Sequence, residues 1–338
     1  MDHIEDLIIT ERGVFLGRRS QRLQVRRGRD VLQQIPFFKL RRLVIVGRGI
    51  SLSSDVIEKC VEHGVQIDFL QWNGQPIAKV ASPQLTGTVA TRRAQLKAYD
   101  SPRAVAFAGA VVRGKVRNQA NTLKYFAKAR RQTDPQLYDA LYARSEEMVA
   151  LLDTLPTNDA GHIDEVRPTL LNIEGRAGAL YWAAVQELLP DGMFQGREHR
   201  GATDMVNSML NYGYGILYTQ VWGALTIAGL DPFAGFLHVD RPGKPSLVLD
   251  LMEEFRSPVV DRPILGMLTR GTTVRMHGGL ISPEDRGKVA RRVLDRLDDA
   301  DYYQGKQHKY RTIIQQQARR LASFLRGEGN YDAHIARW

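Results

Sequence analysis

The sequence contains a single cysteine, Cys60, among its 338 residues. One thiol excludes an internal disulfide and a zinc site built on several cysteines, and it suits a reducing compartment. The start, Met-Asp-His-Ile-Glu-Asp, is acidic where an export signal would be basic. We therefore expect the protein to stay in the cytoplasm.

Several common enzyme motifs are also missing from the sequence. It has no Walker loop, no glycine-rich dinucleotide fingerprint, no Gly-x-Ser-x-Gly elbow and no Cys-x-x-Cys pair. Nucleotide hydrolysis, redox chemistry and acyl transfer therefore lose their usual support.

Residues 205–230 lack any charged side chain. About 20 apolar residues suffice to span a membrane, but Asn207, Ser208, Asn211 and Gln220 interrupt this run. The segment therefore predicts a helix buried between other helices, and we expect no membrane contact.

Positive charge is in excess. The 47 Lys and Arg residues outnumber the 37 Asp and Glu residues, which gives a net charge of +10 and favours a polyanionic partner such as nucleic acid. Between Arg92 and Arg131, eleven basic residues accompany the single acid Asp100. This stretch is either a DNA-binding helix, with Asn118 and Asn121 bonding phosphates, or a solvated helical face.

The pattern of apolar residues divides the chain into two parts. Short runs predict strands at 7–10, 14–16, 23–25 and 43–46, a helix at 55–63 capped by Ser54, and a hairpin around Asn73-Gly74. Beyond Pro83, longer periods predict helices at 90–132, 136–153, 169–189, 204–228, 246–256, 283–299 and 308–327. We predict an α+β fold, with a small N-terminal β-rich domain over 1–85 and a larger all-α domain over 86–338.

Glu174 stands out because helical spacing places it on an apolar stripe with Leu170 and Tyr181. A buried acid is costly unless it is paired, protonated or bound to a metal. An ion pair with Arg167 or Arg200 is the simplest explanation. The small residues that follow Glu174 leave room for a bulky substrate beside it.

His238 precedes a helix with several acids. Ser246 is placed to cap that helix, and Asp250 and Glu253 lie three residues apart on one side of it, with Glu254 adjacent. The helix dipole is the plain explanation for acids near a helix start. Like charges so close repel, however, and a hard divalent metal bound by carboxylates and an imidazole would remove that repulsion.

Four motifs together carry a family resemblance. They are Asn172-Ile-Glu174-Gly-x-Ala-Gly-x-x-Tyr181, Asn207-x-x-Leu210-Asn211-Tyr212-Gly213-Tyr214, Gly235-Phe-Leu-His238 and Leu249-Asp250-Leu-Met-Glu253-Glu254-Phe-Arg256. In order and spacing, and essentially from end to end, the chain resembles the CRISPR-associated spacer integrases, the "Cas-one" family.

This resemblance implies a homodimer whose β-rich domain makes dimer and partner contacts, and one Mg²⁺ or Mn²⁺ ion in each α-helical domain. Glu174, His238 and Glu253 match the family's metal-ligand positions, and Asp250 matches a nearby acid that supports the site. The third ligand position is Asp in some members and Glu here. Arg256, Arg241 and Lys244 match basic positions that meet DNA phosphates, and the basic stretch adds the DNA-binding candidates Arg113, Lys115 and Arg117.

The implied reaction takes place in a prokaryotic cytoplasm. A 3′-hydroxyl of a short DNA duplex attacks a phosphodiester at a repeat boundary of the CRISPR array, with the help of a small "Cas-two" partner protein. Two alternatives stay open. One is a stand-alone metal-dependent DNA nuclease that acts on branched repair intermediates, and the other is a non-catalytic DNA-binding scaffold whose acids form ordinary ion pairs.

Overall fold

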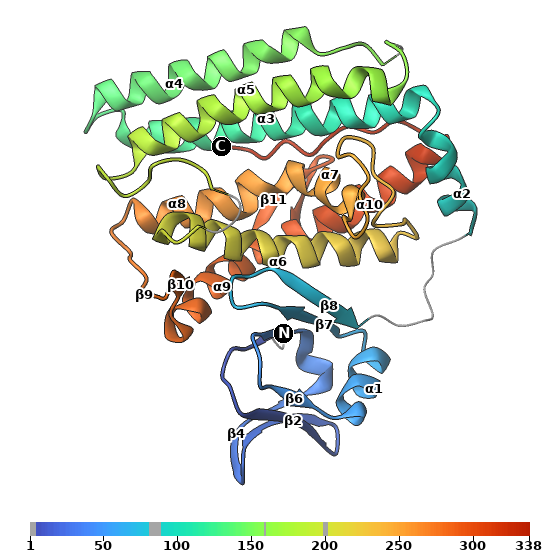
Figure 1. The fold of residues 1–338 in the computed structure, drawn as a ribbon, viewed down its shortest axis with the longest axis vertical. Helices are drawn as coiled ribbons and strands as arrows, with labels where there is room; N and C mark the ends of the chain where they lie inside the picture. The colour runs from blue at the N-terminus through green and yellow to red at the C-terminus, as the bar shows by residue number, and fades with distance from the viewer. Residues whose placement is uncertain (1–4, 81–88, 159, 199–201) are drawn as a thin grey trace.

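The computed structural model describes residues 5–80, 89–158, 160–198 and 202–338 (Figure 1). A β-rich lobe holds the N-terminal part, and a larger helical lobe lies above it in the figure. The predicted α+β class is confirmed. The predicted domain boundary at 85/86 lies outside the described residues, so the division into two domains stays a prediction.

Two four-stranded sheets form the β-rich lobe. The first has the order β1 (Glu5–Ile9), β5 (Leu40–Val46), β7 (Gln66–Leu70) and β8 (Pro76–Val80). The second has the order β4 (Asp30–Pro36), β3 (Arg22–Arg27), β2 (Val14–Arg19) and β6 (Ser51–Leu52). Strands β1, β5 and β7 run parallel, and β8 is antiparallel to β7. Buried side chains of both sheets share one core with helix α1 (Ser54–Glu62).

The local predictions for this lobe hold with small corrections. The hairpin at Asn73-Gly74 is confirmed, with Gly74 at a φ of 84°. Helix α1 is also confirmed, but its N-cap is Ser53 and not Ser54. Strand β4 was not predicted. Its side chains from Asp30 to Gln33 are all exposed, so this part of the sequence has no alternation of buried apolar and exposed polar residues.

The helical lobe contains nine α-helices within the described residues. They are α2 (Val89–Ala98), α3 (Pro102–Arg130), α4 (Pro135–Ala150), α5 (Ile163–Leu188), α6 (Met205–Ile227), α7 (Ser246–Phe255), α8 (Arg262–Leu268), α9 (Pro283–Asp298) and α10 (Tyr310–Leu325). The helix predicted over 90–132 is two helices, because Ser101 caps α3 and Pro102 begins it. Helix α8 and the short hairpins β9–β10 (Met276–His277, Leu280–Ile281) and β11–β12 (Ala300–Tyr303, Lys306–Lys309) were not predicted.

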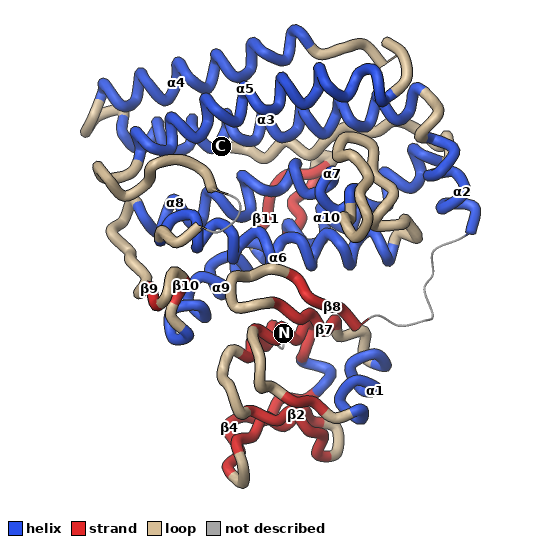
Figure 2. Tube along the Cα trace, in the orientation of Figure 1, coloured by secondary structure: helices blue, strands red, loops and turns tan. Residues whose placement is uncertain are grey.

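Helix α3 lies in the middle of the helical lobe (Figure 2). Helices α4 and α5 cover one side of it, and α7 and the C-terminal segment cover the other. Helix α6 is buried, as its uncharged sequence predicted, with Leu210, Tyr212 and Leu217 almost inaccessible to solvent. Among the described residues, no helix has both the length and the apolar content to cross a membrane.

Hydrogen bonds from a buried charge cluster of the first sheet join the two lobes. Arg42 on β5 lies 2.6 Å from Asp68 on β7 and donates to the hydroxyl of Thr219 on α6. Lys79 on β8 lies 3.5 Å from Asp68 and donates to the carbonyl of Thr219. The two cations share the one carboxylate of Asp68, and their hydrogen bonds to Thr219 bind the first sheet to α6.

The turn at Gly74 also packs directly on α6. A Cβ atom added at Gly215 would overlap the carbonyl oxygen of Gly74, so only glycine at 215 permits this approach. In contrast, a Cβ added at Gly287 on α9 would have no neighbour within 4 Å.

We predict that Gly215→Ala destabilises the protein by about 1–3 kcal/mol, because helix and hairpin must separate. The control Gly287→Ala should be neutral or stabilising by up to about 1 kcal/mol, since alanine is the better helix former. Urea denaturation measures both free energies of unfolding. Equal stabilities for the two variants would contradict the close packing of Gly74 on α6.

Candidate metal centre and DNA-binding surface

Two predicted metal ligands meet around one lysine. Glu174 lies on α5, Glu253 on α7 and Lys115 on α3. The Lys115 ammonium contacts the Glu174 carboxylate and lies 2.7 Å from Oε2 of Glu253. The structure thus brings together two acids that are 79 residues apart in the chain, with a cation between them.

Glu253 is almost completely buried, with 3% of its surface exposed. Its Oε1 accepts a hydrogen bond of 2.9 Å from Nε of Arg256, whereas its Oε2 has no aligned hydrogen bond despite its contact with Lys115. Burial alone would raise the pKa of Glu253, but the charges of Arg256, Lys115 and His238 outweigh it and lower the pKa to about 2. Glu253 is therefore ionised at neutral pH.

Asp250 organises the His238 loop from one turn earlier on α7. Its buried carboxylate accepts hydrogen bonds from the backbone N–H groups of Phe236, Leu237 and His238. It also lies 2.8 Å from Nδ1 of His238. This contact orients the imidazole and leaves its Nε2 for another ligand, which suits the supporting role expected of Asp250. Ser246 does not cap α7 with its side chain, because the N-cap is Pro245.

The described residues contain no group of three or more His, Cys, Asp or Glu side chains that could hold a metal ion as they stand. Lys115 lies between the two glutamates instead. The donor types nevertheless suit Mg²⁺ or Mn²⁺. The Glu174 and Glu253 carboxylates meet at Lys115, His238 lies near enough to Glu253 to help lower its pKa, and a buried Glu253 oxygen lacks an aligned partner. A divalent ion would have to displace Lys115 from the two carboxylates.

Glu174 differs from its predicted environment. Its side chain is 26% exposed and paired with Lys115, so the proposed partner Arg167 is wrong. Arg167 instead pairs with Asp164 and donates to the Phe236 carbonyl. The other proposed partner, Arg200, lies outside the described residues.

The predicted room beside Glu174 is present. A Cβ added at Gly175 or Gly178 would meet no atom within 4 Å. The surface of α5 next to the carboxylate is therefore open, which gives a bulky substrate access to the site.

The DNA-binding candidates fall into different environments. Arg113 and Arg117 are exposed on α3, but Lys115 between them contacts Glu174 and Glu253. Arg256 is turned toward Glu253 and lies 4.8 Å from the ring centre of Tyr214.

The His238 loop carries the remaining DNA-binding candidates. Arg241 is exposed and Lys244 half-buried. Together with Phe233 and Asp240 they line an open depression of about 460 Å³. The loop therefore offers two cations beside the candidate metal centre.

Asn118 and Asn121 do not face a DNA phosphate, contrary to one prediction for the basic stretch. Asn118 is buried and donates to the carbonyls of Glu254 and His334. Asn121 donates to the carbonyl of Ala336. Helix α3 therefore turns a polar stripe toward the C-terminal segment, and only part of it is a solvated basic face.

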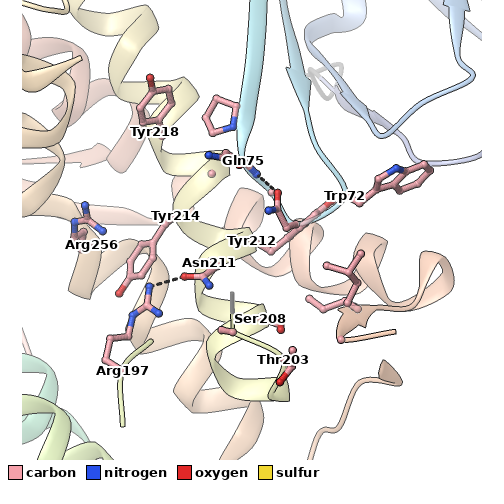
Figure 3. A pocket seen from close by; sticks show the side chains of 18 of the residues that line it. Trp72, Gln75, Arg197, Thr203, Ser208, Asn211, Tyr212, Tyr214, Tyr218 and Arg256 are labelled. Atoms are coloured by element: carbon pink, nitrogen blue, oxygen red, sulfur yellow. Dashed lines mark hydrogen bonds between the residues drawn. The ribbon is translucent and has the colours of Figure 1, made fainter. Parts of the chain in front are cut away.

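A cavity of about 1020 Å³ is lined in part by Arg256, the residue that donates to Glu253 (Figure 3). The β7–β8 turn, α6 and the β9–β10 hairpin line it, and Arg256 and Arg197 contribute positive charge. Asn211 accepts a 2.6 Å hydrogen bond from Arg197. Tyr214 also lines the cavity.

Behind Arg256 lies a buried group that the sequence did not reveal. Tyr214 and Tyr181 both donate hydrogen bonds to the carboxylate of Asp261. Burial raises the pKa of Asp261 to about 6, and these hydrogen bonds offset only part of the effect. In the sequence, the only indication of this group was that Tyr181 and Tyr214 belong to two of the motifs that carry the family resemblance.

Comparison with known proteins agrees with the resemblance. The family model described as CRISPR associated protein Cas1 matches residues 7–293. A CRISPR-associated endonuclease Cas1 of Archaeoglobus fulgidus is 37% identical over 98% of this chain and 99% of the relative.

Two solved structures share the fold. One is a casposase bound to integration product, with a TM-score of 0.80, 23% identity and coverage of 96% of this chain and 92% of that one. The other is a Cas6-RT-Cas1–Cas2 complex, with a TM-score of 0.76, 21% identity and coverage of 98% of this chain and 36% of that one. The family model and the Archaeoglobus relative, which span most of the chain, show that this protein belongs to the CRISPR-associated protein Cas1 family.

Proposed function

We propose that this protein is a metal-dependent DNA integrase and endonuclease of CRISPR adaptation that inserts short duplex DNA into a repeat array. The observation that carries the proposal is the meeting of Glu174 and Glu253 around Lys115, beside an imidazole held by Asp250. The names of the relatives support it, since they include an endonuclease, a casposase with its integration product and a complex with Cas2.

In this proposal Glu174, Glu253 and Nε2 of His238 hold one Mg²⁺ or Mn²⁺ ion. The bound ion supplies Lewis-acid stabilisation of charge on the phosphoryl oxygens. Asp250 fixes the tautomer and orientation of His238 through Nδ1. Arg256 offsets the charge of Glu253.

The proposed reaction is a direct transesterification. The attacking 3′ oxygen forms a bond to phosphorus as the bond to the leaving 3′ oxygen breaks, and the proton of the attacking hydroxyl ends on the leaving oxygen. The number of phosphodiester bonds is unchanged, so the step needs no nucleotide cofactor. Protein cations hold the phosphate for in-line attack.

The proposed partners are double-stranded DNA, a second copy of this chain and a small Cas2 protein. The net charge of +10 supports DNA binding. Edge strand β4 exposes Val31 and Leu32, each to 49%, which supports a homodimer contact on the β-rich lobe. We place the reaction in a prokaryotic cytoplasm.

We predict that Glu174→Ala abolishes both strand joining and cleavage, because a metal ligand is lost. Glu187→Ala is a matched control, since Glu187 lies on the same helix and pairs with Arg144 at the surface. Product formation with Mn²⁺ is measured on gels. Wild-type rates for Glu174→Ala would overturn the proposed metal centre.

The same assay separates the integrase from a repair nuclease. We predict that the protein, its Cas2 partner, a repeat-containing plasmid and a 3′-hydroxyl duplex together yield covalently joined DNA. A duplex with 3′-dideoxy ends should yield no joined product, since the nucleophile is missing. Nicked plasmid without joined product, at equal rates for the two duplexes, would favour the nuclease.

We also predict that the affinity for duplex DNA falls steeply with salt. Replacement of exposed Arg117 by Ala should lower the slope of log K against log [salt] by about 1, because one phosphate contact is lost. Arg144→Ala, on α4, is the control. Binding isotherms at salt concentrations from about 50 to about 300 mM measure the slopes, because affinities that depend on phosphate contacts change strongly over this range. A flat response would remove the exposed face of α3 from the DNA-binding surface.

A further inference from the structure

Glu254, the neighbour of Glu253, has a buried carboxylate that faces away from the metal centre. It accepts hydrogen bonds from the Tyr331 hydroxyl, from Nε2 of Gln317 at 2.8 Å and from the backbone N–H of His334 at 2.9 Å. Two of these three donors belong to the last eight residues of the chain. Glu254 therefore ties α7 to the C-terminal segment.

Residues 331–336, which we term the strap, run between α3 and α7 (Figure 1). The amide of Asn118 on α3 donates to the carbonyls of Glu254 and His334 and accepts from the backbone N–H of Ala336. Asn121, one turn further on, donates to the Ala336 carbonyl. One short segment is thus hydrogen bonded to both helices.

Gly114 makes room for the strap. A Cβ atom at this position would lie 2.5 Å from Cβ of Ala333 and 3.3 Å from Cγ of Glu254. Gly114, Asn118 and Asn121 follow one another at helical spacing, so one stripe of α3 faces the strap. Lys115, the residue next to Gly114, meets Glu174 and Glu253.

We propose that the strap and its anchor Glu254 position the metal centre by holding α7 against α3, so that Glu253 stays opposite Glu174 and Lys115. The inference rests on the proposed function, because it assigns the strap a purpose in metal binding. Glu254 is in this sense a positioning residue. Its carboxylate bonds Tyr331, Gln317 and His334 and not a candidate ligand, so it acts through Glu253, its covalent neighbour.

A first test compares Mn²⁺ binding by titration calorimetry in the full-length protein. We expect Glu254→Gln and Tyr331→Phe to raise the Kd for Mn²⁺ about tenfold, as changes around metal ligands commonly do. The control is Arg326→Ala, because Arg326 bonds Glu328, Ser323 and Thr91, which all lie outside the strap. The Kd of this control variant for Mn²⁺ should stay within about twofold of the wild-type value, because the contacts of Glu254 are unchanged.

Joining rates provide a readout that loss of stability alone would not give. With the variants, saturating Mn²⁺ should restore kcat, and KM for DNA should not change. Folded variants with the Mn²⁺ affinity of wild type would overturn the inference. A wild-type protein that binds no Mn²⁺ would overturn the metal centre of the proposed function as well, so the two failures are distinguishable.

A second measurement needs no variant and applies even if both substitutions prevent folding. Coupling between two sites is reciprocal, so Mn²⁺ should slow hydrogen exchange at the backbone amides of His334 and Ala336 in the wild-type protein. The surface amide of Asn330 serves as the internal control. Identical exchange at His334 and Ala336 with and without Mn²⁺, in a protein that binds Mn²⁺, would contradict the coupling.

Discussion

Two carboxylates can share a confined space in ionised form only if positive charge lies between them. Lys115 meets this requirement for Glu174 and Glu253. Its own pKa shows the balance, because burial lowers it, but the two glutamates outweigh burial and the net shift is upward. The same ion pairs link α3, α5 and α7 to one another, so they contribute both to the packing of the helical lobe and to the charge balance of the site. A divalent ion bound as proposed would therefore compete with Lys115 for the same carboxylates.

Local signals drew attention to the candidate residues, and the family resemblance then selected Glu174, His238 and Glu253 among them as ligands. His238, Asp250 and Glu253 stand within one short stretch, and Glu174 is an acid on an otherwise apolar helix face. Lys115 was predicted to bind DNA because it is one of many basic residues on α3. Its actual contacts come from two other helices, and no spacing within α3 shows which of its faces those helices cover.

The fold shows the same division between local and tertiary information. Long helices and the Asn73-Gly74 hairpin were predicted because periodicity or turn chemistry specifies them within a few residues. The strands β9 to β12 have two to four residues each, too few for an alternating pattern to emerge. The join between the lobes was also hidden, since Arg42 and Asp68 look like surface charges in sequence and are almost fully buried in the structure.

Glu253 and Glu254 show most clearly that tertiary packing decides a residue's role, because they are chemically identical neighbours on one helix. Successive helical residues point about 100° apart, so the two carboxylates enter different surroundings. Cations surround Glu253 and lower its pKa to about 2. Burial raises the pKa of Glu254, and the hydrogen bonds from Tyr331, Gln317 and His334 offset only part of that effect. One acid therefore keeps its charge for the site, while its neighbour is held by neutral donors of the strap and α10. Helix-dipole arguments treat both acids alike, and only the partners brought by tertiary packing give them separate roles.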